Sequence, residues 1–166
     1  MTCPAGTPPL CGMRTSDTVY LIDTNVLSAS APTKTVPAVD VINWMDRNSA
    51  DLFISMITVA EVEEGIAKTR REGAHRKGDR LAEWLDTLLH LYSARVLPLD
   101  ITAARVLGTL SDRARGLGHT PGFADLAIAA TAAVRGCTVL TRNVKHFDML
   151  GIPVQDPFTR LPPEAG

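Results

Sequence analysis

Three carboxylates and one amide stand where a sheet of parallel strands would gather them. Asp23 directly follows a β-rich run, residues 18–22 (TVYLI), and Asn143 follows another, residues 137–141 (CTVLT). Glu61 and Asp125 each lie in the first turn of a predicted helix. Parallel strands place their carboxyl ends, and the starts of the helices that follow, at one edge of the sheet. We therefore treat these four side chains as candidates for a single site.

The chemistry of such a group points to a hard divalent cation. Clustered carboxylates repel one another, so protons or a cation must compensate their charge. Mg²⁺ and Mn²⁺ prefer carboxylate and water oxygens, neutralise phosphate oxygens and lower the pKa of an attacking water. The four histidines lack the spacing of a zinc site. The group thus predicts a Mg²⁺ or Mn²⁺ site suited to phosphate chemistry.

Each residue of the group also has a purely structural explanation. Asp23 is a residue type that caps a turn after a strand. Thr58 and Glu61 match a capping box, in which Glu61 would bond the start of its own helix. Asp125 would complement the dipole of its helix, and Asn143 is a common turn residue. The case for a metal site depends on the group, not on any one member.

The segments around these positions alternate between strand-like and helical patterns. β-rich runs predict strands at residues 18–22, 51–55, 96–99, 137–141 and 152–154. Apolar residues three or four apart predict helices at 37–47, 58–71, 81–94 and 123–135. Asp100 is the predicted N-cap of a further helix that ends at Arg115, and a turn is expected around Phe147. This alternation predicts an α/β three-layer domain with a central parallel sheet of about five strands flanked by helices.

The composition suits one domain of this class. Of 166 residues, 45% are hydrophobic but only 5% aromatic, so the core should be aliphatic. We expect the domain to span residues 17–158, between a disordered N-terminal tail (1–16) and a C-terminal tail (159–166). The Pro- and Gly-rich start lacks the basic and apolar regions of a signal peptide, and Met13 is an alternative start to Met1.

The cysteines and the apolar segments indicate in which cellular compartment the protein is expected. Three cysteines without a framework spacing argue against a disulfide-stapled secreted domain. Cys137 lies in an apolar run and is expected to be a small buried residue. The longest apolar helical stretch, residues 126–134, is too short to cross a bilayer. We therefore expect a cytoplasmic protein without membrane contact.

Four segments follow one another in a recognisable order: residues 21–28 (LIDTNVLS), 57–65 (ITVAEVEEG), 120–130 (TPGFADLAIAA) and 140–147 (LTRNVKHF). Together they resemble the PIN-domain toxins of bacterial toxin–antitoxin pairs, the VapC family. The resemblance spans residues 19–158, and its first and third segments are the specific ones. It implies a metal-dependent ribonuclease with a five-stranded parallel sheet, a homodimer that a small antitoxin holds inactive.

The resemblance also assigns roles to individual residues. The family's catalytic and metal-binding acids correspond to Asp23, Glu61 and Asp125, with Asp23 and Asp125 holding Mg²⁺ or Mn²⁺ and Glu61 binding the metal or orienting the attacking water. The family's frequent fourth acid falls at Asn143, which leaves open whether one or two metals bind; Asp148 is an alternative. The residues expected to support the ligands by hydrogen bonding are Asn143, Thr141 and Asn25.

RNA binding would depend on local basic patches, because the net charge is −1. Residues 68–80 (KTRREGAHRKGDR) hold six Lys and Arg, among them Arg70 and Arg71, against two acidic residues. This segment is either a phosphate contact or a solvated connection between helices. Arg142, Lys145 and His146 lie nearer the acidic group in sequence and are further candidates for contact with the RNA backbone.

Two alternative functions stay open at this point. The chain could be a PIN-like module that acts with an antitoxin as a DNA-binding repressor complex, with little nuclease activity because Asn143 replaces an acid. It could also be a PIN nuclease that has no antitoxin. Receiver domains, haloacid-type phosphatases, dinucleotide-binding folds, Walker A proteins and nucleophile-elbow hydrolases are excluded, since their motifs are absent from the sequence.

Overall fold

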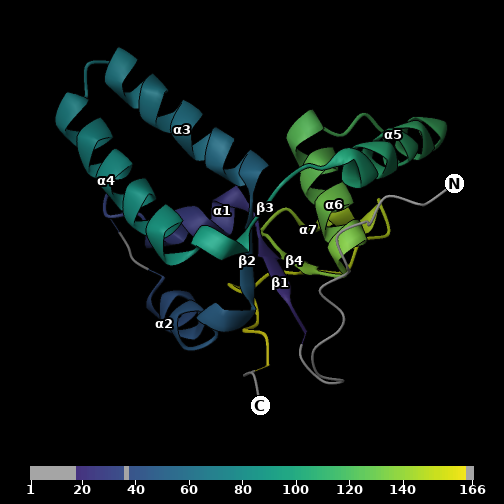
Figure 1. The fold of residues 1–166 in the computed structure, drawn as a ribbon, viewed down its shortest axis with the longest axis horizontal. Helices are drawn as coiled ribbons and strands as arrows, with labels where there is room; N and C mark the ends of the chain where they lie inside the picture. Colours follow the sequence, from purple (N-terminus) through teal and green to yellow (C-terminus); the bar gives the residue numbers. More distant parts are fainter. Residues whose placement is uncertain (1–17, 36–37, 164–166) are drawn as a thin grey trace, which may run out of the picture.

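The fold is built on one sheet of five strands, seen in a computed structural model that describes residues 18–35 and 38–163 (Figure 1). The strand order is β3-β2-β1-β4-β5, and every neighbouring pair is parallel. The strands are β1 (Tyr20–Ile22), β2 (Leu52–Ser55), β3 (Val96–Leu97), β4 (Thr138–Leu140) and β5 (Val154–Gln155). The predicted N-terminal tail, residues 1–16, lies outside the described residues.

Helices connect the strands and cover both faces of the sheet (Figure 1). Within the described ranges they are α1 (Thr24–Leu27), α2 (Val39–Arg47), α3 (Met56–Arg71), α4 (His75–Leu91), α5 (Ile101–Gly116), α6 (Phe123–Arg135) and α7 (Val144–Asp148). Helices α3 and α4 form a hairpin that projects away from the sheet. Gly136 ends α6 in the left-handed conformation, with φ 69°, which glycine adopts without strain.

The core lies in two layers because side chains alternate along each strand. Leu21 and Val139 pack in one buried cluster with residues of α5, α6 and α7. Their neighbours Ile22 and Leu140 pack in the other cluster with residues of α1, α2, α3 and α4. The predicted three-layer α/β architecture with five parallel strands is confirmed.

Two helices begin earlier than predicted, and one capping interpretation is wrong. The N-cap of α3 is Ser55, whose hydroxyl accepts a hydrogen bond from the Ile57 amide at 3.1 Å. Thr58 is therefore inside the helix, where its buried hydroxyl donates to the carbonyl of Ile22, so Thr58 and Glu61 do not form a capping box. Helix α4 begins at His75, so most of the basic segment is helical rather than a connection.

Two further differences concern short elements. The predicted turn around Phe147 is helix α7, and α1 directly follows Asp23 where no helix was predicted. Both helices have only four or five residues, which is too few for an apolar period to show in the sequence. The predicted helix 123–135 and the N-cap at Asp100 are confirmed.

Cys137 is buried, as expected, and burial raises the pKa of its thiol to about 11. The described part of the chain contains no helix that is both long and apolar enough to span a membrane.

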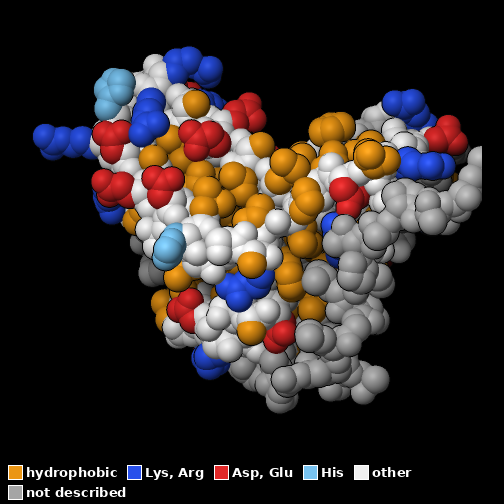
Figure 2. All heavy atoms as spheres, in the orientation of Figure 1, with side chains coloured by type: hydrophobic (Ala, Val, Ile, Leu, Met, Phe, Trp, Pro, Cys, Tyr) orange, Lys and Arg blue, Asp and Glu red, His pale blue; other side chains and the backbone are white. Residues whose placement is uncertain are grey.

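Apolar side chains also gather on the surface. Figure 2 shows hydrophobic atoms over the hollow between the α3–α4 hairpin and α5. The large exposed hydrophobic residues include Met56 at the start of α3, Ile101 at the start of α5 and Phe123 at the start of α6. The exposed fraction of Ile101 is 82%. A surface of this kind is typical of a protein–protein contact.

A partly buried ion pair ties α5 to α6. Asp100 caps α5 through a 2.8 Å hydrogen bond from the Ala103 amide to one carboxylate oxygen. Its other oxygen accepts a 2.9 Å hydrogen bond from Arg135, whose side chain is only 8% exposed. One carboxylate thus serves both as a helix cap and as the counter-charge of a buried guanidinium.

We predict that Asp100→Ala lowers the free energy of unfolding by about 3 kcal/mol, because the cap is lost and Arg135 is left buried without a counter-charge. Asp100→Asn should lose less, about 2 kcal/mol, since an amide oxygen still caps α5. Urea unfolding followed by circular dichroism measures both values. Asp112→Ala, an exposed change on α5, should stay within about 0.5 kcal/mol. Equal losses for Asp100→Ala and Asp112→Ala would contradict the assignment.

Candidate active site

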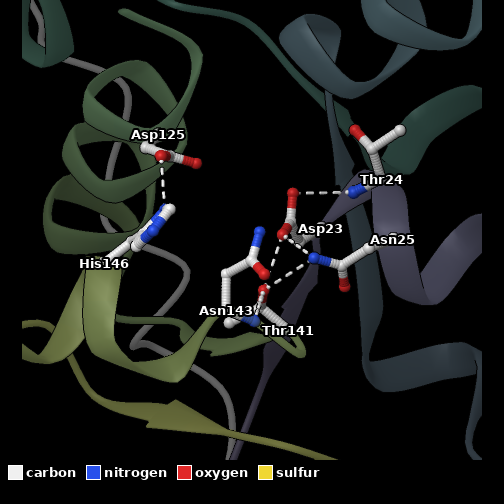
Figure 3. A network of polar contacts seen from close by, with 7 residues as sticks. All are labelled: Asp23, Thr24, Asn25, Asp125, Thr141, Asn143 and His146. Carbon is white, nitrogen blue, oxygen red and sulfur yellow. Dashed lines mark hydrogen bonds and ion pairs between the residues drawn. The ribbon is translucent and has the colours of Figure 1, made fainter. Parts of the chain in front are cut away.

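Asp23 lies at the carboxyl end of the central strand and is buried, with 4% exposure. It is also the N-cap of α1, since one carboxylate oxygen accepts from the Thr24 amide at 2.8 Å. The other oxygen accepts from the Thr141 hydroxyl at 2.6 Å and from the side-chain amide of Asn25 at 2.8 Å. Three donors from two parts of the chain therefore fix the orientation of this carboxylate (Figure 3).

Thr141 joins the segments that follow β1 and β4. Its buried hydroxyl donates to Asp23 and accepts from the Asn25 side chain at 3.1 Å and from the backbone amide of Asn143 at 2.9 Å. The Asn25 oxygen in turn accepts from the backbone amide of Arg142 at 3.0 Å. Thr141 and Asn25 thus lie where a supporting role requires them.

Glu61 reaches the same edge of the sheet from the second turn of α3, one turn later than predicted. Its carboxylate accepts a short hydrogen bond from the Thr24 hydroxyl. Thr24 lies next to Asp23, so this bond links the second carboxylate to the first. The hydroxyl of Thr24 was not expected to act as a partner of Glu61.

Asp125 lies in the first turn of α6, as predicted. One of its carboxylate oxygens lies 2.9 Å from Nδ1 of His146 on α7 (Figure 3). The sequence had indicated His146 only as a contact for RNA. In Figure 3, Asp125 lies on the left and Asp23 near the centre, and one carboxylate oxygen of Asp125 points to the side on which Asp23 lies.

The three carboxylates influence one another electrically. Burial raises the pKa of Asp23 above its usual value, and the charge of Asp125 adds to this effect, while hydrogen bonds from Thr141, Thr24 and Asn25 oppose it. Burial also raises the pKa of Glu61, as do the charges of Asp23 and Asp125, against the hydrogen bond from Thr24. Among the described residues, no Lys or Arg forms an ion pair with any of the three.

The donor set fits a hard divalent cation, although the carboxylates in the described part of the chain do not form a closed cage around one position. It consists of carboxylate, hydroxyl and amide oxygens, which Mg²⁺ and Mn²⁺ prefer, and no Lys or Arg of the described residues pairs with its carboxylates. Within residues 18–35 and 38–163, no three His, Cys, Asp or Glu side chains lie close enough together to enclose a metal. Mg²⁺ commonly binds through one or two carboxylates and keeps several waters, so a closed cage is not required.

The remaining predicted residues divide into near and far groups. Asn143 is exposed at the N-cap of α7, and its side chain points toward Asp23 in Figure 3. Arg142 and Lys145 are exposed in the same segment, and the Arg142 guanidinium stacks 4.0 Å from the ring centre of Phe158. Arg70 and Arg71 lie at the far end of α3, about 15 Å along the helix from Glu61.

Arg70 already has local partners. Its guanidinium pairs with Asp79 at 2.9 Å, and its side-chain carbons cover Gly78 so closely that a Cβ there would lie 2.5 Å from Arg70 Cγ. Arg70 therefore helps to pack α3 against α4.

Another residue of the basic segment, Lys77, lies with Lys34 in the wall of a cavity of about 240 Å³ that borders Thr24 and Glu61. Lys34 was not predicted, because a lone lysine in a loop gives no pattern.

The fold and the site together define a class of protein. A three-layer parallel sheet brings Asp23, Glu61 and Asp125 from three different elements to one edge, and no Lys or Arg among the described residues pairs with them. This is the arrangement of an α/β protein with a carboxylate-rich site suited to phosphate chemistry.

The PIN domain family matches residues 20–150, and the chain belongs to this family. It is 36% identical over 142 residues to the plasmid stability protein StbB of Pseudomonas syringae pv. tomato, covering 84% of this chain and 99% of the relative. It is 34% identical over 145 residues to the VapC ribonuclease Y4jK of Sinorhizobium fredii, covering 84% and 98%. The toxin FitB of Neisseria gonorrhoeae is also 34% identical, over 142 residues, with coverages of 84% and 99%.

Solved structures that contain FitB-type proteins are also similar to this chain. The crystal structure of FitAcB from Neisseria gonorrhoeae superimposes with a TM-score of 0.73 at 33% identity, covering 84% of this chain and 99% of the other. A structure of FitAB bound to an IR36 DNA fragment superimposes with a TM-score of 0.67 at 31% identity, covering 84% and 96%.

We predict that Glu61→Gln stabilises the metal-free protein near pH 7. The substitution removes a charge that Asp23 and Asp125 repel, and it keeps a side-chain oxygen that accepts the hydrogen bond from the Thr24 hydroxyl. The expected gain is on the order of 0.5 kcal/mol, since Glu61 is only half-buried and water screens the repulsion. A raised folded-state pKa means that the wild type loses stability as the pH rises through it, so the gain should vanish below about pH 4, where Glu61 is protonated in both states.

Thermal melting in EDTA between about pH 4 and pH 8 measures this difference. Glu63→Gln is the matched control, because Glu63 lies on the same helix, is exposed and is not among the charges acting on Asp23 or Glu61. A gain that is equal for both variants, or that does not depend on pH, would contradict the assigned repulsion.

Proposed function

We propose that this protein is a divalent-metal-dependent endoribonuclease, the toxin of a toxin–antitoxin pair, which acts in the cytoplasm. The observation that carries the proposal is the convergence of Asp23, Glu61 and Asp125, none of which forms an ion pair with a Lys or Arg among the described residues. The proposal is supported further by relatives named as a VapC ribonuclease and a FitB toxin. The chain spans nearly their whole length.

The proposed catalytic and metal-binding residues are those three carboxylates, each with its own task. Asp23 and Asp125 would hold Mg²⁺ or Mn²⁺, and Glu61, turned by Thr24, would bind the metal or orient the attacking water. A bound cation of this kind polarises a phosphoryl oxygen and lowers the pKa of a water. Thr141 and Asn25 would keep Asp23 in its orientation, and Asn143 would contribute a polar, uncharged group.

RNA would approach the acidic edge along basic residues on either side of it. Arg142 and Lys145 lie at the end of β4 and on α7, and stacking on Phe158 limits the freedom of the Arg142 guanidinium. Lys34 and Lys77 border the cavity next to Glu61. Phosphate contacts of this type position a strand without reading its sequence.

The proposed partners are a small antitoxin and a second copy of this chain. Both are supported by the apolar surface over the hollow between the α3–α4 hairpin and α5 (Figure 2), and by exposed hydrophobic residues such as Met56 at the start of α3 and Ile101 at the start of α5. The similarity to FitAB bound to DNA favours a second role, in which the toxin–antitoxin complex binds DNA as a repressor. The two roles differ in what they require, because only the nuclease needs the three carboxylates and a metal.

We predict that purified protein without antitoxin cuts RNA into discrete fragments with Mg²⁺ or Mn²⁺ and does not in EDTA. Asp23→Asn and Asp125→Asn should each reduce the rate at least about 100-fold, since each removes a charge that holds the cation. Total RNA separated on a denaturing gel is the readout. Asp112→Asn, an exposed change on α5, is the matched control and should cut like the wild type.

Identical fragment patterns from the wild type and both variants under every metal would overturn the nuclease proposal. DNA binding by the purified toxin–antitoxin complex, measured in parallel by gel shift, would then favour the repressor role as the main function.

We further predict that Arg142→Ala raises the KM for RNA about fivefold with a smaller change in kcat, because Arg142 contacts substrate phosphate and not the reacting atoms. Arg71→Ala should change the KM less than twofold, since Arg71 lies at the far end of α3. Steady-state cleavage of a labelled oligonucleotide at two salt concentrations measures both. The opposite order of effects would place the RNA along the α3–α4 hairpin instead.

A further inference from the structure

His146 and Asp125 form a pair between two helices, and the catalytic proposal assigns no task to His146. Nδ1 of His146, on α7, lies 2.9 Å from one carboxylate oxygen of Asp125, on α6. The His146 side chain is 53% exposed and that of Asp125 23% exposed, so the pair lies at the surface edge of the site. The other carboxylate oxygen of Asp125 points toward the side on which Asp23 lies (Figure 3).

The neighbours of both residues hold the pair in place. Leu126, next to Asp125, and Phe147, next to His146, are buried in the same hydrophobic cluster, and Phe147 has no exposed surface. The backbone positions of Asp125 and His146 are therefore set by the core beneath them. The side chains of Asp125 and His146 can still rotate, and the hydrogen bond between them restricts this rotation.

The three carboxylates differ in how many donors orient them. Asp23 accepts from Thr24, Asn25 and Thr141, and Glu61 accepts from Thr24. For Asp125, His146 is the sole hydrogen-bond donor found among the described residues. An ionised carboxylate has only acceptors, so the Nδ1 of His146 must carry the hydrogen and donate it.

We propose that His146 is a positioning residue for Asp125. Its hydrogen bond occupies one oxygen of Asp125 and keeps the other turned toward Asp23, where a divalent cation would bind. The inference depends on the proposed function, because it assigns a task to Asp125 as a metal ligand. A carboxylate oriented before the cation arrives loses less side-chain freedom on binding, so the bond should strengthen metal affinity.

The test is Mn²⁺ affinity in the full chain without RNA, measured by titration calorimetry. His146→Ala should weaken Mn²⁺ binding about 10-fold, the lower end of the usual effect of removing a group that orients a ligand. His146→Asn should recover most of the loss, because its amide nitrogen lies at the position of Nδ1 and also donates. His90→Ala, an exposed change in α4, is the matched control and should bind as the wild type does.

Kinetics distinguish positioning from direct contact with RNA. In His146→Ala the Mn²⁺ concentration that gives half the maximal cleavage rate should rise about 10-fold, whereas the rate at saturating Mn²⁺ should return to within about twofold of the wild type. Equal melting temperatures in EDTA would exclude a general loss of structure, since the side chain is exposed at the surface.

Three results would overturn the inference. Equal Mn²⁺ affinities of His146→Ala and the wild type would contradict it. A rate that stays low at saturating Mn²⁺ and is not restored in His146→Asn would instead indicate RNA contact. A wild type that binds no Mn²⁺ overturns both this inference and the proposed function, whereas Mn²⁺ binding without RNA cleavage overturns the proposed function alone.

Discussion

The Asp23 carboxylate sits at the end of the strand in the middle of the sheet, in a place that is costly for a charge. Burial removes most of its water, and the charge of Asp125 makes ionisation harder still. Hydrogen bonds from Thr24, Asn25 and Thr141 replace part of the lost water. Because these donors come from α1 and from the end of β4, the first and last thirds of the domain must meet for the carboxylate to be accommodated.

The other acidic residues add electrostatic repulsion at the same edge of the sheet. Glu61 gains a hydrogen bond from Thr24 but is repelled by Asp23 and Asp125. At the α5–α6 interface, the charge of the buried Arg135 guanidinium is neutralised by Asp100. The carboxylates at the sheet edge, in contrast, have no Lys or Arg partner among the described residues. Such an arrangement is typical of a binding site that is less stable than a fully paired one.

Much of this arrangement could be predicted from the sequence, because strand ends are easy to locate. Asp23 follows an apolar run, and Asp125 begins a long Ala-rich helix, so the topology alone brought both to one edge. Glu61 was harder, since Thr58 and Glu61 match a capping box while Ser55 is the residue that caps α3. The bond between His146 and Asp125 could not be predicted, because α7 is too short to display a period that would tell which way His146 points.

The position of Thr141 has a consequence for how the protein comes into being on the ribosome. Its hydroxyl contacts Asp23 across 118 positions of the chain, and β4 must pair with β1 before that contact forms. Closing so large a loop is slow and yields nothing until the later segment has been synthesised. A nascent chain that ends before β4 therefore has Asp23 and Glu61 but not the group that orients Asp23. The arrangement around Asp23 is therefore completed only after β4 has been synthesised and has paired with β1.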